Sequence, residues 1–410
     1  MLRVHESGRV EFVFDGVIIS RGGVIDFAGS WDAVANEYQG PVRTSAGVLM
    51  PPMLDIHTHI PQWPIRGRFV EGVPIDQPGG RLLEGLKRNV FPAEAKTISE
   101  AYTRELVSNF AADTLRHGVV GGCTYLTPFA TAAQIALREL DPRWSVGLVM
   151  MNQNCPQNLR TDEETFEVDV EHLAGEFGRR LVVTDRFAVA VDTPLRRRGS
   201  EIARRLDLRT QTHLNEQVGE KGFVEQTLYP DYANYADVYA KDGLFDQPSI
   251  VAHCIEMTDS EWAILEDKGC AIAHCPTSNL LLGSNVMRLD EVMGRGIAVA
   301  LATDVGASPT QSMLAEMRRF LQVHAAQFST LATPTLAMFL ATRAPAKIMG
   351  LDLGLFDSGR PASFIEVAPI RPVTRDMTSA VVIEALLPVD PDSPTQTVLC
   401  VTLDGVFRQF

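Results

Sequence analysis

Four histidines and one aspartate stand where a metal ion could be bound. His57 and His59 are two residues apart in DIHTHI, so on a β-strand both rings would face the same side and could hold one ion. An H-x-H pair alone is a weak signal, because a histidine is more often a hydrogen-bonded polar group in the core. His213 in QTHLNEQ, His253 in VAHCIE and Asp304 in LATDVG strengthen it to the prediction of a metal centre. Imidazoles with one carboxylate suit one Zn²⁺ per chain, and Fe²⁺ accepts the same set.

Glu216 is the candidate for moving protons at this centre. It follows His213 by three residues, so a regular strand would point the two side chains to opposite faces. We therefore expect Glu216 just past the strand, where the loop can turn its carboxylate into the same cavity. Zn²⁺ lowers the pKa of bound water to ~7, and Glu216 could then protonate a leaving group while Asp304 accepts a proton. The alternatives are a surface carboxylate for Glu216 and a turn aspartate for Asp304.

The elements that position these residues follow a βα rhythm from about residue 48 to 306. Eight β-branched or apolar runs predict strands at 47–56, 119–127, 145–152, 179–187, 209–214, 249–255, 270–276 and 297–305. Eight strands joined by helices predict an α/β fold, a (β/α)₈ TIM barrel. The candidate ligands, with His274 as a fifth histidine, fall at the C-terminal ends of strands, where such barrels build active sites.

Both ends of the chain show a different pattern. Strand-like alternation broken by glycine occupies residues 9–50, and it returns over 363–410 in SFIEVAPI, SAVVIEALL and TVLCVTLDGVF. These segments predict one small β-sandwich domain. We expect residues 1–50 and 351–410 to form the sandwich and residues 51–350 to form the metal-dependent barrel.

Composition excludes several classes of partner. The 410 residues carry 37 Lys+Arg against 51 Asp+Glu, a net charge of −14, which argues against nucleic acid or an anionic membrane surface. The densest basic cluster, Arg196 to Arg198, is expected to be a solvated face. Without a long apolar stretch or a signal peptide pattern at the N-terminus, the chain is expected to be cytoplasmic. His5, His117, His172 and His324 are expected to be ordinary polar groups.

Signatures of other chemistries do not occur. The sequence contains no H-x-E with P-C-x-x-C, no G-x-S-x-G and no phosphate-binding glycine loop. Its six cysteines include no C-x-x-C pair, so we expect reduced, mostly buried thiols. Hydrolysis without an organic cofactor is the chemistry that fits.

The motifs, in this order, resemble those of the amidohydrolase superfamily, and their finer text resembles its guanine deaminase branch. The shared text spans nearly the whole chain and includes HTHIPQW, FPAE, DRF, HLNEQ, LYPDYANYADVY and AHCPTSNLLLGS. The resemblance implies zinc held by His57, His59, His213 and Asp304. It makes His253 either a further ligand or a hydrogen-bond partner of the water, and it gives proton transfer to Glu216 and Asp304.

The resemblance also implies the residues that bind the substrate ring. Gln62, Arg186 and Phe187 match positions that hold a purine, Trp63 belongs to the same set, and His274 fits a role at the pocket wall. Phe187 could instead be core packing and Arg186 a structural ion pair.

At some positions the sequence departs from the family. Asp185 stands where a proline is common, and Ala302 and Ala307 stand where glycines are usual; these alanines could narrow the pocket. Pro52 and Ser363 also differ from the usual residues. None of these positions is a candidate ligand.

Together these features predict a zinc-dependent hydrolytic deaminase that converts guanine and water into xanthine and ammonia. The resemblance suggests a homodimer. One alternative is the same chemistry on another aminated heterocycle, such as 8-oxoguanine, a pterin or an s-triazine. An alternative of another class is a metal-bound binding protein without activity.

Overall fold

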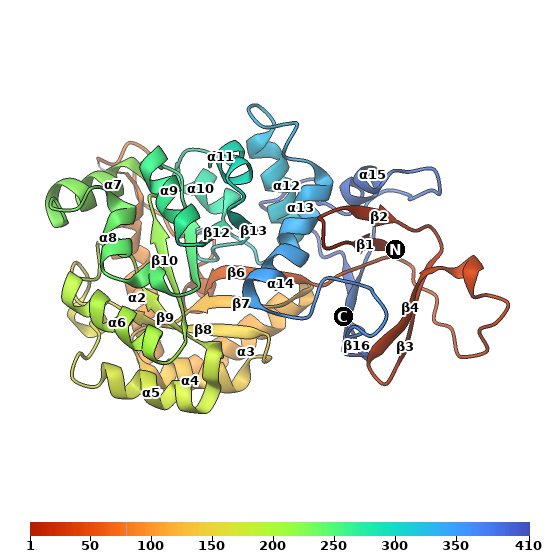
Figure 1. The fold of residues 1–410 in the computed structure, drawn as a ribbon, viewed down its shortest axis with the longest axis horizontal. Coiled ribbons are helices and arrows are strands. Elements are labelled where there is room, and N and C mark those ends of the chain that lie inside the picture. Colours follow the sequence, from red (N-terminus) through yellow and green to blue (C-terminus); the bar gives the residue numbers. More distant parts are fainter. Residues whose placement is uncertain (79) are drawn as a thin grey trace. The chain divides into compact units, whose positions relative to one another are not determined.

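The computed structural model describes residues 1–78 and 80–410, and its central feature is a barrel of eight parallel strands (Figure 1). Each strand is hydrogen-bonded to the next along the chain. Backbone hydrogen bonds from Asp304 N to His57 O (2.9 Å) and from His59 N to Val305 O (3.2 Å) join the end of the last strand to the first. The strands are β6 (Met53–His59), β7 (Val119–Tyr125), β8 (Trp144–Met150), β9 (Leu181–Asp185), β10 (Arg209–Leu214), β11 (Ser249–His253), β12 (Ala271–His274) and β13 (Ala298–Leu301).

The predicted barrel is confirmed, with one difference at its first strand. The run predicted as a strand over 47–56 is two strands, β5 (Val48–Met50) and β6. Pro51 and Pro52 separate them, and since proline has no backbone N–H to donate, the run cannot pair continuously. β6 runs from Met53 to His59, so His57 and His59 lie within its last three residues, at the C-terminal end of the barrel.

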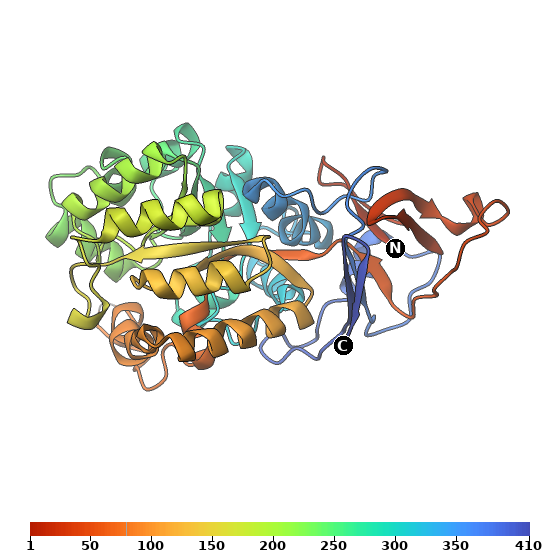
Figure 2. The ribbon, with the colours of Figure 1, turned by 90° about the horizontal axis from the view of Figure 1, so that it is seen from below.

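Helices lie outside the sheet between successive strands (Figure 2). Side chains cap several of them; Asp192, for example, accepts a hydrogen bond from Leu195 N at the start of α6. Among the described residues, no helix is long and apolar enough to cross a membrane. The helices are α1 (Leu82–Gly85), α2 (Phe91–Glu94), α3 (Glu100–Arg116), α4 (Ala130–Glu139), α5 (Phe166–Phe177), α6 (Thr193–Arg205), α7 (Val218–Phe223), α8 (Tyr235–Lys241), α9 (Asp259–Asp267), α10 (Pro276–Leu282), α11 (Leu289–Gly294), α12 (Met313–His324), α13 (Pro334–Ala341), α14 (Arg343–Met349) and α15 (Ser379–Glu384).

The chain divides into two compact units. Unit 1 holds residues 1–55, 112–120 and 311–410, and unit 2 holds residues 56–111 and 121–310. All of the predicted site residues belong to unit 2. The domain boundaries at residues 50 and 350 stay a prediction.

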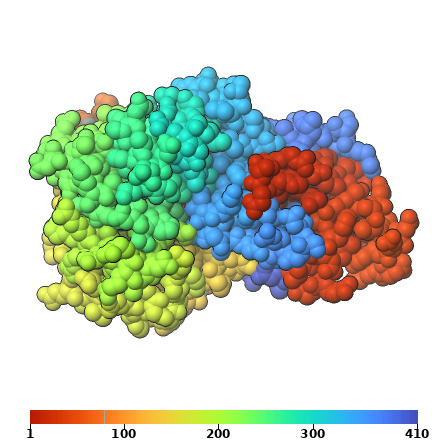
Figure 3. All heavy atoms as spheres, viewed as in Figure 1, coloured from red at the N-terminus to blue at the C-terminus, as the bar shows by residue number. Residues whose placement is uncertain are grey.

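Unit 1 brings together the two ends of the chain, as predicted. Its main sheet has the order β16-β15-β14-β5, so strand β5 from the N-terminal region pairs antiparallel with β14. Red N-terminal and blue C-terminal atoms accordingly lie next to each other in Figure 3. The remaining strands are β1 (Leu2–Val4), β2 (Val10–Phe12), β3 (Gly16–Arg21), β4 (Val24–Ser30), β14 (Phe364–Val367), β15 (Val398–Leu403) and β16 (Val406–Gln409).

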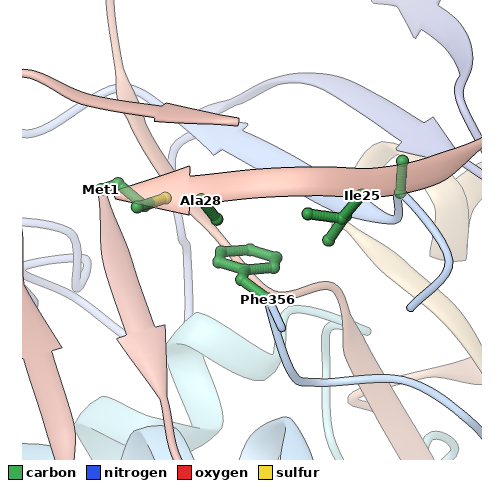
Figure 4. Packing of buried hydrophobic residues seen from close by; sticks show 5 residues of the cluster. Met1, Ile25, Ala28 and Phe356 are labelled. Carbon is green, nitrogen blue, oxygen red and sulfur yellow. The ribbon is translucent and has the colours of Figure 1, made fainter. Parts of the chain in front are cut away.

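A small apolar cluster fixes the two ends to each other within unit 1. Met1, together with Ile25 and Ala28 of β4, packs with Phe356 and Ala362 from the C-terminal segment (Figure 4). All five are buried, so this contact removes apolar surface from water and stabilises the unit.

Two expectations about local structure are wrong. The segment SAVVIEALL, expected as a strand, begins helix α15, because the Thr378 hydroxyl accepts a hydrogen bond from Val381 N and caps the helix. Arg196, expected on a solvated face, is fully buried on α6, where the carboxylates of Asp185 and Asp242 neutralise it. Arg197, beside it, does keep most of its side chain in solvent.

Candidate active site

Three histidines and one aspartate meet at the C-terminal end of the barrel. Ligand atoms of His57, His59, His213 and Asp304 all lie within 4.8 Å of one another, and all four residues are buried. Oδ1 of Asp304 is 3.3 Å from Nε2 of His57 and 3.0 Å from Nε2 of His59. A second group that meets the same 4.8 Å limit consists of Glu216, His253 and Asp304.

The protonation states of these histidines suit a divalent ion. His213 Nδ1 is 2.7 Å from the carbonyl oxygen of Arg186; since a carbonyl only accepts, Nδ1 carries the proton and Nε2 keeps its lone pair. Burial lowers the pKa of His59 to about 3 and takes that of His213 well below its usual range. Neutral imidazoles with one carboxylate are donors that divalent transition-metal ions accept, so the residues present fit such an ion.

Glu216 lies next to this cluster. It is buried, and its Oε1 has no hydrogen-bond partner among residues 1–78 and 80–410. Burial, followed by the negative charges of Asp304 and Glu220, raises the pKa of Glu216 well above its usual range, which favours the protonated acid. Glu220 Oε2 accepts hydrogen bonds from the backbone nitrogens of Glu216 (2.9 Å) and Gln217 (3.3 Å), and it thereby holds the turn after β10 in place.

His253 faces Glu216 across the site. Its Nε2 is 3.5 Å from Oε2 of Glu216, and its Nδ1 is 3.1 Å from the amide nitrogen of Asn279. Since an amide N–H donates, Nδ1 accepts and the ring proton sits on Nε2, toward the cavity. Burial lowers the pKa of His253 to about 3, so the ring is neutral.

The backbone is strained where these residues emerge. Asn215, His253, Cys254 and Asp304 have φ values between 52° and 73°, in the left-handed region that non-glycine residues rarely adopt. They follow or end strands β10, β11 and β13. Such strain persists only where the surrounding structure enforces it, and it is common at functional sites.

Glu94, Gln62 and Arg186 form a polar triad, of which Arg186 lines the cavity beside the cluster. Glu94 Oε1 accepts hydrogen bonds from Nε2 of Gln62 (3.0 Å) and from Arg186 (3.3 Å), and all three side chains are buried. Because a carboxylate can only accept, Glu94 fixes the Gln62 amide with its NH₂ group toward Glu94. Gly306 permits this arrangement, since a Cβ there would lie 2.1 Å from Oε1 of Gln62.

Aromatic rings complete the surroundings of the histidines. Tyr125, at the end of β7, has its ring centroid 4.6 to 5.0 Å from those of His57, His59 and His213. Phe187 meets His213 edge-on at 6.5 Å. These contacts limit the rotation of the imidazoles.

The cavity beside the cluster has a volume of about 20 Å³, which is room for about one water. Its walls combine the polar residues with an apolar side, and they consist of His59, Phe69, Leu82, Leu86, Arg186, Phe187, His213, Glu216, Leu282 and Asp304. Gln217 ties the apolar side together, since its side chain accepts from Leu82 N (3.2 Å) and donates to Leu282 O (2.9 Å).

Several predicted residues lie outside this lining, namely His57, Gln62, Trp63, His253 and His274. Trp63 is half-buried with the guanidinium of Arg66 4.3 Å from its ring centroid, and His274 is buried at the end of β12. Ala302 and Ala307 are buried but do not line the cavity either. Their roles in substrate binding, like those of the other site residues, stay predictions.

Sequence reasoning missed several residues of the site. Glu94, Ser278 and Asn279 lie in the stretches FPAE and HCPTSN, whose resemblance to the family indicates the stretch but not the role of each residue. The hydroxyl of Ser278 is 2.6 Å from Oδ2 of Asp304. The apolar wall was not predicted, because Leu82 and Leu86, although spaced as on one helix face, do not differ in sequence from leucines of the core.

Comparison with known proteins gives consistent results. A model of the amidohydrolase family matches residues 48–406. The guanine deaminase of Escherichia coli strain K12 is 30% identical over 380 residues, which cover 88% of this chain and 83% of the relative.

Two solved structures have the same fold. A guanine deaminase from C. acetobutylicum with guanine in its active site superposes with a TM-score of 0.86 at 22% identity, covering 100% of this chain and 98% of the other. An adenosine deaminase from Xanthomonas campestris with bound zinc gives 0.79 at 21% identity, covering 98% and 89%.

Proposed function

This chain belongs to the amidohydrolase family, and from that premise we propose that it is a metal-dependent deaminase that converts guanine and water into xanthine and ammonia. The observation that carries the proposal is that Glu216 and Asp304 line the same buried cavity as Arg186 and Phe187. Two carboxylates for proton transfer thus lie beside groups suited to a polar aromatic ring. The activity of the Escherichia coli relative supports guanine as the substrate.

We assign Zn²⁺ to His57, His59, His213 and Asp304. The zinc in the adenosine deaminase of the same fold supports this choice over Fe²⁺. A divalent ion supplies Lewis acidity, which makes water acidic enough to lose a proton near neutral pH.

The carboxylates divide the proton transfers between them. Asp304 takes a proton from the water that attacks the carbon bearing the amino group. Glu216, whose raised pKa favours the protonated acid, gives its proton to the neighbouring ring nitrogen. Asp304 then passes the proton that it took from water to the amine, which leaves as ammonia, and Glu216 takes up the proton of the new hydroxyl group as that group becomes the product carbonyl. His253 acts as a hydrogen-bond donor from Nε2 to the oxygen that becomes negative, rather than as a further ligand.

Ring binding falls to the polar triad and Phe187. Arg186 donates to a ring carbonyl, Gln62 presents its Oε1 as an acceptor because its NH₂ is held by Glu94, and Phe187 offers a face for stacking. The cavity of about 20 Å³ is smaller than a purine, so we expect its apolar side, which includes Leu82, Leu86 and Leu282, to open when the ring binds. Trp63 and His274 would act from outside the first layer of contacts.

The deciding experiment measures ammonia release and absorbance change with purified, metal-analysed protein. Guanine, 8-oxoguanine, a set of pterins and an s-triazine are tested in parallel. A kcat/KM for guanine above ~10⁴ M⁻¹s⁻¹ supports the proposal. Turnover of another ring, with one metal ion bound, keeps the chemistry and replaces the substrate. Bound metal without turnover of any ring would favour a binding protein. A cytoplasmic location and a homodimer stay predictions.

A further inference from the structure

The segment that carries Arg186 and Phe187 is buried although it has no regular secondary structure. Residues 185–191 are all buried, and residues 186–191 form most of the loop between β9 and α6. A buried irregular segment needs partners for its backbone groups. Backbone bonds supply some of them, among them those from Asn152 N and Gln153 N to Ala190 O, and side chains from other elements supply the rest of those described here.

Four side chains from other elements bind this backbone. The carbonyl of Arg186 accepts from His213 Nδ1 (2.7 Å), and the amide of Ala188 donates to the hydroxyl of Tyr239 (2.9 Å). Gln153 Nε2 donates to the carbonyls of Ala188 and of Val191, both at 3.2 Å. Asn154 adds a bond of 2.9 Å to the carbonyl of Val189.

Arg196 holds the segment at both ends. Its Nε donates to Oδ2 of Asp185 (2.8 Å), the residue directly before Arg186, and its Nη2 donates to the carbonyl of Val191 (2.6 Å). The Tyr229 hydroxyl accepts from the same Nη2 (3.2 Å) and donates to the Val191 carbonyl.

The opposite side of the guanidinium is fixed as well. Nη1 of Arg196 donates to Oδ2 of Asp242 (2.9 Å), and the other oxygen of Asp242 accepts from Arg197 Nε and from the Tyr232 hydroxyl, both at 2.9 Å. Gly199, one turn further along α6, allows this helix to pack closely against Met150 of β8, because a Cβ at position 199 would lie 2.4 Å from Met150 Sδ.

The location of this charge cluster is informative because its net contribution to stability is small. The side chains of Arg196, Asp185 and Asp242 have no exposed surface, and buried ion pairs rarely stabilise a fold more than apolar packing would. The planar, multiply bonding guanidinium instead fixes geometry, which lysine cannot do with a single ammonium.

We propose that Arg196 is a positioning residue for substrate recognition: by binding Asp185 and the Val191 carbonyl together, it holds the segment 186–191 so that Arg186 and Phe187 face the cavity. Arg196 touches no substrate itself. The inference rests on the proposed function in one respect, that Arg186 and Phe187 contact the ring.

The test uses the full-length, metal-loaded protein and the variant Arg196→Lys. We expect KM for guanine to rise ~10-fold or more, since the groups that bind the ring are displaced. The carbonyl of Arg186 also holds His213 Nδ1, so metal content is measured in parallel, and kcat per bound metal ion should change less than ~3-fold. Hydrogen exchange in the peptide covering 186–191 should become faster. Tyr229→Phe, which removes one hydroxyl and no charge, should shift both readouts in the same direction by a smaller factor, and it serves if Arg196→Lys does not fold.

Arg343→Lys is the matched control. Arg343 also binds a carboxylate, Glu6, and a backbone carbonyl, that of Leu353, but it belongs to unit 1. The Arg343→Lys variant should leave unchanged both KM for guanine and the rate of hydrogen exchange in the peptide covering 186–191. A lower melting temperature in the Arg196 and Tyr229 variants, with KM within ~2-fold of the parent and unchanged exchange, would overturn the proposal and leave a purely structural role.

Failure of the proposed function gives a different result. If the parent protein does not deaminate guanine, the substrate assignment is wrong, but the exchange measurement needs no substrate. Unchanged exchange in both variants then overturns the role of Arg196, and faster exchange supports it. If the parent turns over another ring, KM for that ring is then compared between the parent and the two variants, with the same expected rise.

Discussion

The hydroxyl of Ser278 donates a hydrogen bond of 2.6 Å to Oδ2 of Asp304, while Oδ1 of the same carboxylate faces His57 and His59. The two oxygens therefore have different partners, and the hydrogen bond from Ser278 restricts rotation of the carboxylate about the Cβ–Cγ bond of Asp304. A ligand held from behind in this way keeps its orientation when the ion is absent.

Replacing Ser278 with alanine should weaken this control. We expect Ser278→Ala to lose about 10- to 100-fold in metal affinity or turnover, the usual effect of removing a partner of a metal ligand. The measurements are metal competition with a chromogenic chelator and kcat. Ser284→Ala is the control, because the Ser284 hydroxyl is buried without a hydrogen-bond partner in the described part of the chain. Equal affinities in the two variants would contradict the role of Ser278.

Glu216→Gln should separate metal binding from proton transfer. The amide keeps the shape of the side chain but cannot deliver a proton, so turnover should fall by a factor on the order of 10²–10⁴ at unchanged metal content. Glu176→Gln, on the surface beside Arg138, should have no effect. Undiminished kcat in Glu216→Gln would remove this residue from the mechanism.

Glu94→Gln should reduce affinity for the ring. Glu94 accepts from both Gln62 and Arg186, and an amide in its place can donate as well, which frees Gln62 to rotate. Hydrogen bonds to charged groups contribute about 1.5–3 kcal/mol, so a rise in KM of about 10-fold or more is expected, with a smaller change in kcat. Steady-state kinetics decide this, and an unaltered KM would show that the orientation of Gln62 does not matter.

Removal of the metal should abolish turnover while most secondary structure remains. A chelator leaves the barrel hydrogen bonds in place but removes the stabilisation by ligand binding, about 4 kcal/mol at a free ion concentration a thousand times Kd. Circular dichroism, thermal melting and elemental analysis follow the change, and added Zn²⁺ should restore both activity and Tm. Full activity in protein shown to be metal-free would refute the assignment of the ion.

His324 should make unit 1 sensitive to acid. It is buried on α12, between Phe320 and Phe328, and burial lowers its pKa from 6.5 to about 4. Because the folded-state pKa is depressed, the stabilisation is present above pH 6.5 and is lost as the pH falls toward 4. The shift corresponds to on the order of 3 kcal/mol.

His324→Phe tests this pH dependence by removing the titrating group. Urea unfolding of parent and variant should give a difference in unfolding free energy that changes by that amount between pH 7 and 4. The exposed His172→Gln provides the control. A constant difference across this pH range would show that His324 does not titrate in the way described.

The barrel was predictable because buried parallel strands are short, nearly continuous apolar runs, and because polar residues at their ends stand out against them. The metal-binding group followed from this, since the C-terminal ends of parallel strands meet in space. Arg196 was not predictable. Its partners Asp185 and Asp242 lie 11 and 46 residues away, and a run of three arginines looks the same whether it faces water or the core.

Other failures have equally local causes. The strand expected in SAVVIEALL had the right composition, but one capping threonine selected a helix. Glu94 and Ser278 stood in recognised stretches, yet which polar side chain in a stretch reaches the site depends on how the loops turn. Sequence spacing predicts which side chains point the same way from a strand or a helix, but loops have no regular period from which to predict this.

The pairing of β5 with β14 also determines when the molecule can be completed. Met50 lies opposite Ile365, so the ribosome has synthesised the whole barrel sequence before the partner of β5 exists. Contacts this distant in sequence form late and slow folding. Until then the edge of β5 that β14 covers in the finished sheet stays unpaired and open to other chains, and a chain that stops before residue 364 would keep it so. Aggregation during synthesis, rather than loss of the metal site, is therefore the expected defect of C-terminal truncation.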